Sequence, residues 1–434
     1  MQDFEIKIRK SCKMKPQNMP VELKIGVELE SFLDKEHALY QLANSLNWDY
    51  LISSFGPYYV ENNGRPGIPI RVIAGLHYLK YLENESDESV VEKFCENPYW
   101  QYFCGFKTFQ HELPCHPTTL VKWRHRVGEA GVEKLLSETI NTAKREGLLP
   151  EKLCRRVNVD TTVQEKAITF PTDAKLYHKM RQNLVKAANK RNVVLRQSYS
   201  RVGKFALLNQ NRYAHARQMK RAKKELRKLK TYLGRVMRDI IRKVPNPDAE
   251  LNKLLCLAKR LLQQKREDKN KLYSLHAPEV ECIAKGKAKA KYEFGCKVAV
   301  TTTCKDPWVV SIFAAHGNPY DGHTLQRSLD QSQRLTEVKA EDAFVDRGYR
   351  GKENHSYGTR IFVSGAKRLP IALKKLLRAR SGIEPIIGHL KEDHRLDRNY
   401  LLGKTGDMIN AVLTGCAFNL RKIMRLMPFA IAGT

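Results

Sequence analysis

The stretch Val157-Asn158-Val159-Asp160-Thr161-Thr162 places a carboxylate within a run of β-branched residues. Val157 and Val159 alternate with polar residues, which is the pattern of a half-buried strand. A second apolar run, residues 343–346, also ends in an aspartate, Asp346. Taken alone, an aspartate at the end of a strand is more often a turn residue than a ligand. The sequence therefore predicts two strands that end in carboxylates, whose role depends on what else lies beside them.

A third acid, Glu384, opens a predicted helix over residues 383–391, and Pro385 after it is typical of a helix start. Alone, Glu384 would be a first-turn glutamate stabilised by the helix dipole. Mg²⁺ prefers carboxylate oxygens, and two ions about 4 Å apart bind both the attacking and the leaving oxygen in a displacement at phosphorus. Asp160, Asp346 and Glu384 together predict such a site, holding two Mg²⁺ ions with Mn²⁺ as a substitute.

The order of the other elements indicates an α/β fold. Residues 157–170 predict a hairpin, and further strands are predicted at 281–283, 294–303, 308–314 and 360–363. A helix begins near Thr324, and a helical tail covers about 371–424. This order fits an RNase H-like core, in which the first and fourth strands are neighbours. Asp160 and Asp346 would then meet at one edge of the sheet.

Composition and charge divide the chain into three predicted domains. Residues 1–150 predict a helical DNA-binding or dimerisation domain, residues 151–171 and 278–424 the catalytic core, and residues 172–277 a basic insertion of two or three long helices. The whole chain carries a net charge of +31, and residues 175–271 supply +23 of it, with 29 Lys or Arg against 6 Asp or Glu. Such a block indicates a polyanionic partner, because phosphate contacts release condensed counterions.

Pro117-Thr118-Thr119-Leu120 predicts the start of a helix in the amino-terminal part. Lys122, Arg124 and Arg126 follow within it and make one face basic. This helix is either the second half of a helix-turn-helix that contacts DNA, or a packing helix with a solvated charged face. The sequence leaves both interpretations open.

Several of these motifs resemble a known family. Arg380-x3-Glu384-x6-Lys391 resembles the signature around the catalytic glutamate of bacterial insertion-sequence DDE transposases, of the insertion-sequence-five group within the insertion-sequence-four-like supergroup. The family's tyrosine, three residues before the arginine, is Leu377 here. Residues 157–160 resemble the first aspartate motif, residues 344–351 the second, and residues 64–69 with 71–82 the amino-terminal domain that often precedes this core.

The resemblance implies that Asp160, Asp346 and Glu384 are the catalytic and metal-binding residues. Arg380 and Lys391 would hold DNA phosphates near the scissile bond, and the same function is expected of Arg347 and Arg350. The implied activity is binding of terminal inverted repeats, cleavage at the element ends and joining of the 3′-hydroxyl to target DNA. The partners would be double-stranded DNA and further copies of the chain, as a homodimer or larger synaptic complex.

Other interpretations remain open at this stage. An RNase H-like nuclease would hydrolyse DNA without joining strands, and an inactive derivative would only bind it. A basic nucleoid or RNA-binding protein would explain the charge but not the ordered acids. Glu165 and Asp173 compete with Asp160 as the first carboxylate. Asp321 lies in the loop 317–323 near His323, where it either assists the site or forms a turn, and its Pro/Gly setting favours the turn.

The sequence predicts a cytoplasmic, nucleoid-associated prokaryotic protein. No stretch reaches the roughly 18 apolar residues of a membrane span, and residues 1–5 lack the apolar core of a secretory signal. The ten cysteines form no Cys-x2-Cys pair, which predicts reduced thiols and no structural zinc site.

Overall fold

The computed structural model describes residues 27–60, 66–265, 267–284, 291–351, 358–366 and 369–431. The chain divides into two compact units, of which unit 1 comprises Met1–Glu165 and Lys297–Thr434 and unit 2 comprises Lys166–Cys296. Gly64 and Arg65 of the amino-terminal motif lie outside the described residues. Among the described residues, no helix is long and apolar enough to cross a lipid bilayer.

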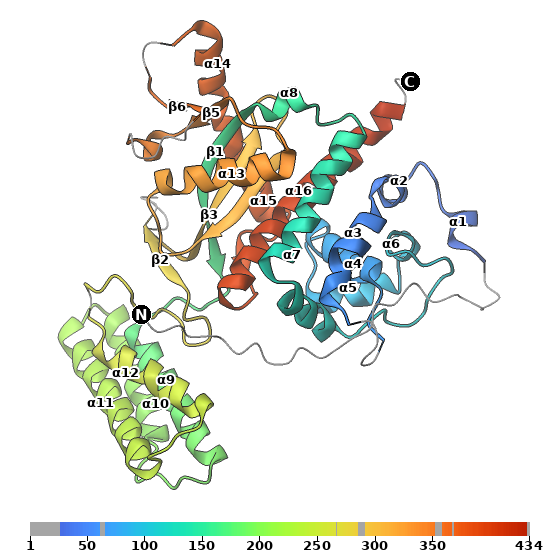
Figure 1. The fold of residues 1–434 in the computed structure, drawn as a ribbon. Coiled ribbons are helices and arrows are strands. Elements are labelled where there is room, and N and C mark those ends of the chain that lie inside the picture. Colours follow the sequence, from blue (N-terminus) through green and yellow to red (C-terminus); the bar gives the residue numbers. More distant parts are fainter. Residues whose placement is uncertain are drawn as a thin grey trace. The chain divides into compact units, whose positions relative to one another are not determined.

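Unit 1 has a mixed α/β structure built on one sheet (Figure 1). In this sheet β3 lies beside β4 and β1, β5 lies on the other side of β1, and β6 lies beside β5. β1 pairs with β5 and β5 with β6 in parallel, whereas β3 and β4 are antiparallel. The short β7 pairs with β1. The strand bounds are β1 Arg156–Lys166, β3 Tyr292–Thr303, β4 Val309–Ala315, β5 Asp342–Val345, β6 Arg360–Val363 and β7 Arg398–Asn399.

The strands predicted at 294–303, 308–314, 343–346 and 360–363 are present, with ends shifted by a few residues. The predicted hairpin over 157–170 is wrong, because β1 runs unbroken to Lys166 and residues 167–170 form no strand. In place of a turn, Thr161–Lys166 continue β1. The buried residues of this part, such as Thr162 and Val163, fix it in unit 1.

Helices surround this sheet and come from both ends of the chain. Those before the sheet are α1 Leu29–Phe32, α2 Ala38–Ser45, α3 Trp48–Phe55, α4 Ile70–Leu82, α5 Asp87–Phe94, α6 Pro98–Phe103, α7 Pro117–Arg145 and α8 Glu151–Cys154. Those after it begins are α13 Leu325–Thr336, α14 Ile371–Ala379, α15 Ile383–Glu392 and α16 Gly403–Ile431. Short 3₁₀ helices lie at Gly56–Tyr58, Asp321–Thr324, Arg347–Tyr349 and Arg380–Gly382.

α16 joins the amino-terminal helices to the sheet, since it packs on α2, α4, α7 and β4 (Figure 1). The buried Asn419 amide accepts a hydrogen bond from Val309 N at 3.0 Å and donates to Val309 O at 2.9 Å and Thr139 Oγ1 at 3.2 Å. One side chain thereby satisfies the backbone of β4 and links α16 to α7. Consequently the helices predicted as a separate domain over 1–150 fall in the same unit as the sheet.

Unit 2 contains the basic segment. In its described residues it has four helices, α9 Asp173–Lys190, α10 Ser200–His215, α11 Met219–Lys243 and α12 Ala249–Gln263, where two or three were expected. Their apolar faces form one core that includes Leu184, Leu233 and Leu261. The strand β2, Glu281–Ala284, pairs antiparallel with the first residues of β3. The unit is wider than the predicted insertion at 172–277, because it includes these strand residues.

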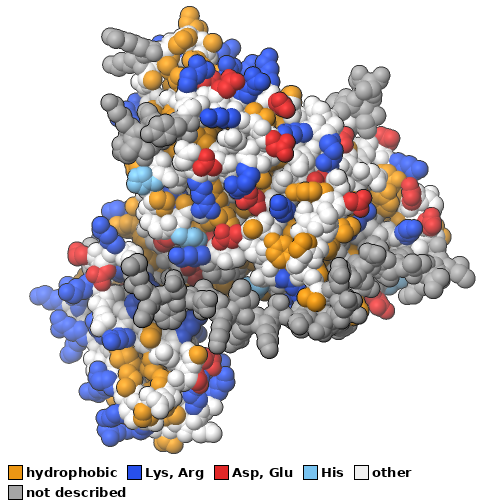
Figure 2. All heavy atoms as spheres, in the orientation of Figure 1, with side chains coloured by type: hydrophobic (Ala, Val, Ile, Leu, Met, Phe, Trp, Pro, Cys, Tyr) orange, Lys and Arg blue, Asp and Glu red, His pale blue; other side chains and the backbone are white. Residues whose placement is uncertain are grey.

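Lys and Arg side chains make up most of the charged atoms visible on unit 2 in Figure 2. Several acidic side chains of this unit form ion pairs with its own lysines and arginines. Asp239, for example, lies beside Arg242 at 2.8 Å and Lys243 at 3.2 Å, and Arg191 binds Asp248 at 2.7 Å. Many of the basic side chains on α11 are exposed, including Lys223, Arg227 and Lys230.

Candidate active site

The first two predicted acids lie at corresponding positions of neighbouring parallel strands. Asn158 is the last residue of β1 that pairs with β5, and it stands opposite Phe344. Asp160 and Asp346 each follow two residues later, so the register brings both to the same end of the sheet. Both side chains are partly exposed, although the strand residues before them are buried. The sheet thus places two carboxylates side by side where solvent can reach them.

Backbone amides orient these two carboxylates. Asp160 Oδ1 accepts a hydrogen bond from Thr161 N at 2.7 Å. Asp346 caps the 3₁₀ helix that follows β5, and its Oδ1 accepts from Gly348 N at 2.8 Å. Amide donors favour the charged form of a carboxylate and fix its direction. Neighbouring backbone amides thus orient one oxygen of each acid.

A third carboxylate, Asp321, joins them from the start of the helical segment after β4. Its Oδ1 accepts from Thr161 Oγ1 at 2.8 Å and forms an ion pair with Lys297 Nζ at 2.8 Å. Lys297 also donates to Pro319 O at 2.6 Å, so this lysine ties the loop before Asp321 to β3. Asp321 was predicted to be a turn residue, and it does begin a 3₁₀ helix, but its side chain contacts the residue next to Asp160.

Gly348 shows how close Asp321 comes to Asp346. A Cβ atom on this glycine would lie 2.9 Å from Asp321 Oδ2 and 3.0 Å from Asp346 Oδ1. The two carboxylate oxygens thus approach one point, and the absence of a side chain at Gly348 keeps the space between them open. Any larger residue here would displace at least one carboxylate.

Tyr349 lies beneath this group of acids. Its side chain is 0% exposed, and its hydroxyl has no hydrogen-bond partner of good geometry among the described residues. Burial raises the pKa of Tyr349 well above its ordinary value, and the negative charges of Asp160, Asp321 and Asp346 raise it further, while the nearby Thr324 side chain opposes the rise. The phenol is therefore a neutral donor that lies within the field of three carboxylates.

Arg380 and Glu384 come from the helical segment that ends the predicted motif. Arg380 Nη1 donates to Asp160 Oδ2 at 3.2 Å, and the two side chains are 13% and 18% exposed. Glu384 lies four residues on, in the first turn of α15, and is exposed. Arg380 belongs to the 3₁₀ segment Arg380–Gly382, and α15 begins at Ile383. Among the described residues no hydrogen bond or ion pair joins Glu384 to Asp160 or Asp346, so the structure brings Arg380 into contact with the site but leaves the place of the Glu384 carboxylate as a prediction.

The carboxylates of Asp160, Asp321 and Asp346 do not converge to within 4.8 Å of one another as a group in the described part of the chain. Two cations, Arg380 and Lys297, instead lie on two of them. The donor set nevertheless suits divalent cations, because it consists of carboxylate oxygens around a position without a side chain, beside an unpartnered hydroxyl. This arrangement fits a metal site whose lysine and arginine partners would have to give way.

The other predicted phosphate ligands lie at the edges of this site. Arg347 and Arg350 follow Asp346 and are exposed, and Arg347 Nη2 would lie 3.3 Å from a Cβ on Gly365. Lys391 is half-buried, seven residues after Glu384 in α15. Leu377, at the tyrosine position of the family signature, is buried and serves as the packing residue of α14.

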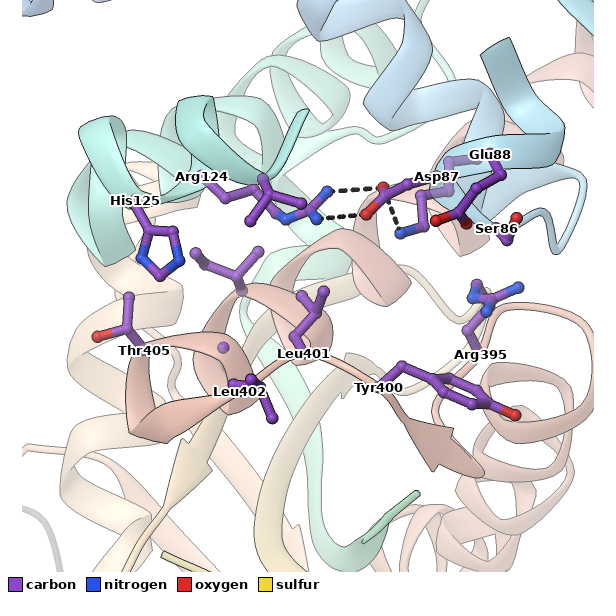
Figure 3. Close-up of a pocket in the computed structure, with 14 residues that line it drawn as sticks. Ser86, Asp87, Glu88, Arg124, His125, Arg395, Tyr400, Leu401, Leu402 and Thr405 are labelled. Atoms are coloured by element: carbon purple, nitrogen blue, oxygen red, sulfur yellow. Dashed lines mark hydrogen bonds and ion pairs between the residues drawn. The ribbon is translucent and has the colours of Figure 1, made fainter. Parts of the chain in front are cut away.

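The predicted basic face of α7 is not uniform. Lys122 is exposed and Arg126 lies over the ring of Tyr59 at 5.1 Å, but Arg124 is only 4% exposed. Arg124 makes two hydrogen bonds to Asp87, at 2.9 and 2.5 Å, as Figure 3 shows. The prediction that Arg124 contacts DNA is therefore corrected, because its guanidinium is used inside the protein.

This ion pair borders a cavity of about 610 Å³, shown in Figure 3. Lys80 also binds Asp87, at 2.7 Å, so two buried cations share one carboxylate. Burial would raise the pKa of Asp87, but Arg124 and Lys80 hold it well below its ordinary value. Burial lowers the pKa of Lys80 to about 8 against the opposing charge of Asp87. These ion pairs hold α4, α5 and α7 together, and this structural role is sufficient to explain the three buried charges.

The sequence offered Asp321 as an acid that could assist the site but favoured a turn, and it did not indicate its neighbours Lys297, Thr161 and Tyr349. Asp321 follows an apolar strand, as Asp160 and Asp346 do, but five residues including Pro319 separate it from β4. Lys297 is a charged residue within an apolar strand, and a lysine there is unusual without a partner. The lysine within an apolar strand and the apolar strand before Asp321 are the two sequence features that could have indicated these residues.

Comparisons with known proteins agree with this description. Residues 27–126 match the model of the transposase domain (DUF772). The chain is 47% identical over 190 residues to an uncharacterized protein, ORF8 in the nfe locus, of Rhizobium meliloti, which covers 44% of this chain and 91% of that protein. No solved structure matches. The chain therefore belongs to one family with this rhizobial protein, and its residues 27–126 are similar to the transposase domain.

Proposed function

We propose that this protein is a DDE transposase, which cleaves DNA at the ends of its element and joins the freed 3′-hydroxyl to target DNA. The observation that carries the proposal is the shared register of Asp160 and Asp346 on the parallel strands β1 and β5. Arg380, from the segment that holds Glu384, contacts Asp160 and thereby supports a common site for the three acids. The match to a transposase domain raises the same expectation independently.

The sheet order supports an RNase H-like core. The strands run in the spatial order β4, β3, β1, β5, β6, with β1, β5 and β6 parallel and β3 antiparallel to β4. Such a core would bring the first strand, the fourth strand and the final helix together at one edge, and with them Asp160, Asp346 and Glu384. The function itself rests on these residues and not on the fold alone.

Each residue has a defined part in the proposed reaction. Asp160, Asp346 and Glu384 would bind two Mg²⁺ ions, which would activate the attacking oxygen and stabilise the leaving one. Thr161 N and Gly348 N keep the two aspartates in position. Arg380, released from Asp160, would contact a phosphate near the scissile bond, and exposed Arg347 and Arg350 would contact its neighbours. Lys391 would contact the same strand from α15.

Double-stranded DNA is the partner that the charge supports. The net charge of +31 and the exposed basic residues of unit 2 favour a long phosphate backbone. Lys122 and Arg126 remain candidates for DNA contact on α7, while Arg124 does not. Terminal repeats at two element ends would require a homodimer or larger synaptic complex, so that both ends are cleaved together.

The experiment uses DNA that carries the native element's ends, a target plasmid and MgCl₂. Nicking at the repeat boundary followed by a joined product supports the transposase, whereas nicking without joining identifies the nuclease alternative. The variant Glu384→Gln is expected to lose both products. Asp330→Asn, which changes an exposed acid on α13, is the matched control and is expected to keep them. DNA binding without either product in the wild type would contradict the proposed catalysis.

A further inference from the structure

We propose that Asp321 is a fourth carboxylate of the metal site and that Lys297 occupies it until a divalent cation binds. This inference rests on the proposed function and deepens it. The three acids of the DDE signature do not include Asp321, and its surroundings suggested a turn. Four residues lie around Asp321 and support this role, namely Thr161, Lys297, Gly348 and Tyr349.

The first step is position. Asp321 Oδ1 lies 2.8 Å from Thr161 Oγ1, and Thr161 is the residue after Asp160 in β1. Asp321 Oδ2 approaches Gly348, the residue that orients Asp346, on the same side as Asp346 Oδ1. Asp321 therefore contacts the strand of Asp160 through Thr161, and its second oxygen approaches Asp346 at Gly348. A purely local turn residue would not contact either strand.

The second step is an independent sign of a missing ligand. The Tyr349 hydroxyl is fully buried, lies in the field of Asp160, Asp321 and Asp346, and has no hydrogen-bond partner of good geometry among the described residues. A buried hydroxyl without a partner costs free energy unless something occupies the adjacent space. A metal-bound water would donate a hydrogen bond to this hydroxyl oxygen, since a phenol both donates and accepts. The space exists because Gly348 has no side chain.

The third step is charge. Two aspartates and Asp321 are close enough to repel one another, and like charges in one site need cations nearby. Lys297, only 8% exposed, supplies one at 2.8 Å from Asp321, and Arg380 supplies another at 3.2 Å from Asp160. A divalent cation that binds these carboxylates would compete with both. Lys297 therefore acts as a positioning residue that holds the Asp321 carboxylate at the site.

A structural role for the pair makes different predictions. If Asp321 only anchors Lys297, removal of either residue lowers stability and leaves metal affinity unchanged. If Asp321 binds the metal, Asp321→Asn weakens metal binding, whereas Lys297→Met strengthens it because a competing cation is gone. The two substitutions thus move affinity in opposite directions only under the proposal.

The test is isothermal titration of the full-length protein with MnCl₂ in the absence of DNA. We expect Asp321→Asn to raise the Kd for Mn²⁺ about tenfold, the lower end of the range for altered ligand surroundings. Lys297→Met is expected to lower the Kd. Asp160→Asn serves as the positive control that removes binding, and Asp330→Asn as the matched negative control. Fe²⁺ in place of Mn²⁺, with peroxide and ascorbate, should cut the wild-type backbone near residue 321.

The outcomes separate the inference from the proposed function. If Asp160→Asn abolishes Mn²⁺ binding while Asp321→Asn and Lys297→Met leave it unchanged, the inference is overturned and the proposed function stands. If the wild type binds no Mn²⁺ at millimolar concentration, both are overturned. Should Asp321→Asn fail to fold, Gly348→Ala keeps every charge and places a methyl group against Asp321 Oδ2. It should weaken Mn²⁺ binding, and Gly56→Ala, where a Cβ meets nothing within 4 Å, should not. Unchanged binding in Gly348→Ala would overturn the inference.

Discussion

Arg380 Nη1 lies 3.2 Å from Asp160 Oδ2, although 220 residues separate them in the chain. This contact connects the helical segment of Glu384 to the first strand of the sheet. It also pairs the cation proposed to contact DNA phosphate with Asp160, one of the proposed catalytic acids. Arg380 thus has two partners in the proposed cycle, a carboxylate before assembly and a phosphate after it.

Substitution of Arg380 should affect chemistry more than binding. Arg380→Ala is expected to slow single-turnover cleavage about 10²-fold or more, the usual cost of losing one group that stabilises developing charge. The Kd for end DNA should change less than threefold, because many other cations contribute. Arg378→Ala, an exposed arginine two residues earlier, is the matched control. Equal losses of affinity in both variants would assign Arg380 to general phosphate binding.

Arg124 and Lys122 should separate stability from DNA binding on one helix. Arg124→Ala leaves Asp87 with one of its two buried cations and is expected to lower the free energy of unfolding by about 3–5 kcal/mol. Lys122→Ala is expected to leave stability within about 0.5 kcal/mol, as for most exposed positions. Urea denaturation measures both. A stable Arg124→Ala protein with reduced DNA affinity would restore the original prediction for this residue.

The buried His77 should make unit 1 sensitive to acid. Burial and the charge of Arg124 lower its pKa to about 3, while a hydrogen bond to Ile73 O opposes the shift. Its Nδ1 is 2.8 Å from Ile73 O and its Nε2 faces Arg124 at 3.4 Å, so a second proton would meet a positive charge.

Because the folded pKa of His77 is below the ordinary value of about 6.5, the unfolded chain binds more protons between about pH 6.5 and pH 3. Stability should therefore fall as the pH is lowered through this range. The low pKa of Asp87 acts in the same direction, since its contribution is lost on acidification. Thermal unfolding at pH 7.5 and pH 5 measures the effect. His77→Gln should reduce the difference in Tm between the two pH values, and the exposed control His215→Gln should not. An unchanged difference in His77→Gln would mean that other groups cause the acid sensitivity.

The exposed basic face of α11 should account for part of the salt dependence of DNA binding. Lys223, Arg227 and Lys230 lie on one face, and changing all three to Gln should reduce the slope of log K against log salt by about 0.9 for each phosphate that is no longer neutralised. A matched triple variant of exposed lysines in unit 1, Lys35, Lys152 and Lys305, is the control. Equal slopes in the wild type and the α11 variant would exclude unit 2 as a DNA-binding surface.

Local pattern was sufficient for the strands that carry Asp160 and Asp346. The residues directly before each aspartate are apolar or buried in a strand, as predicted. The full length of β1 was not predictable from this pattern, since burial resumes after Asp160 and the strand continues to Lys166. The helix start near Pro117 was also predictable.

Long-range partners were the part that sequence pattern could not supply. Arg124 looked like a solvent-facing cation, but its partner Asp87 lies 37 residues away on another helix. Asp321 had the turn chemistry of its neighbours, and only the sheet brings it to Thr161. The bounds of unit 2, Lys166–Cys296, also differ from those of the predicted insertion at 172–277. The change in charge and composition marks the helices of the insertion, whereas the unit also includes residues of β1, β2 and β3.

The most direct test of a single three-acid site is single-turnover cleavage of end DNA in MgCl₂ by Asp160→Asn, Asp346→Asn and Glu384→Gln, with DNA affinity measured for each. The account predicts that all three lose Mg²⁺-dependent nicking while each keeps a Kd for DNA near that of the wild type. Nicking at the wild-type rate in Glu384→Gln would contradict it and would transfer the role of the third acid to another carboxylate.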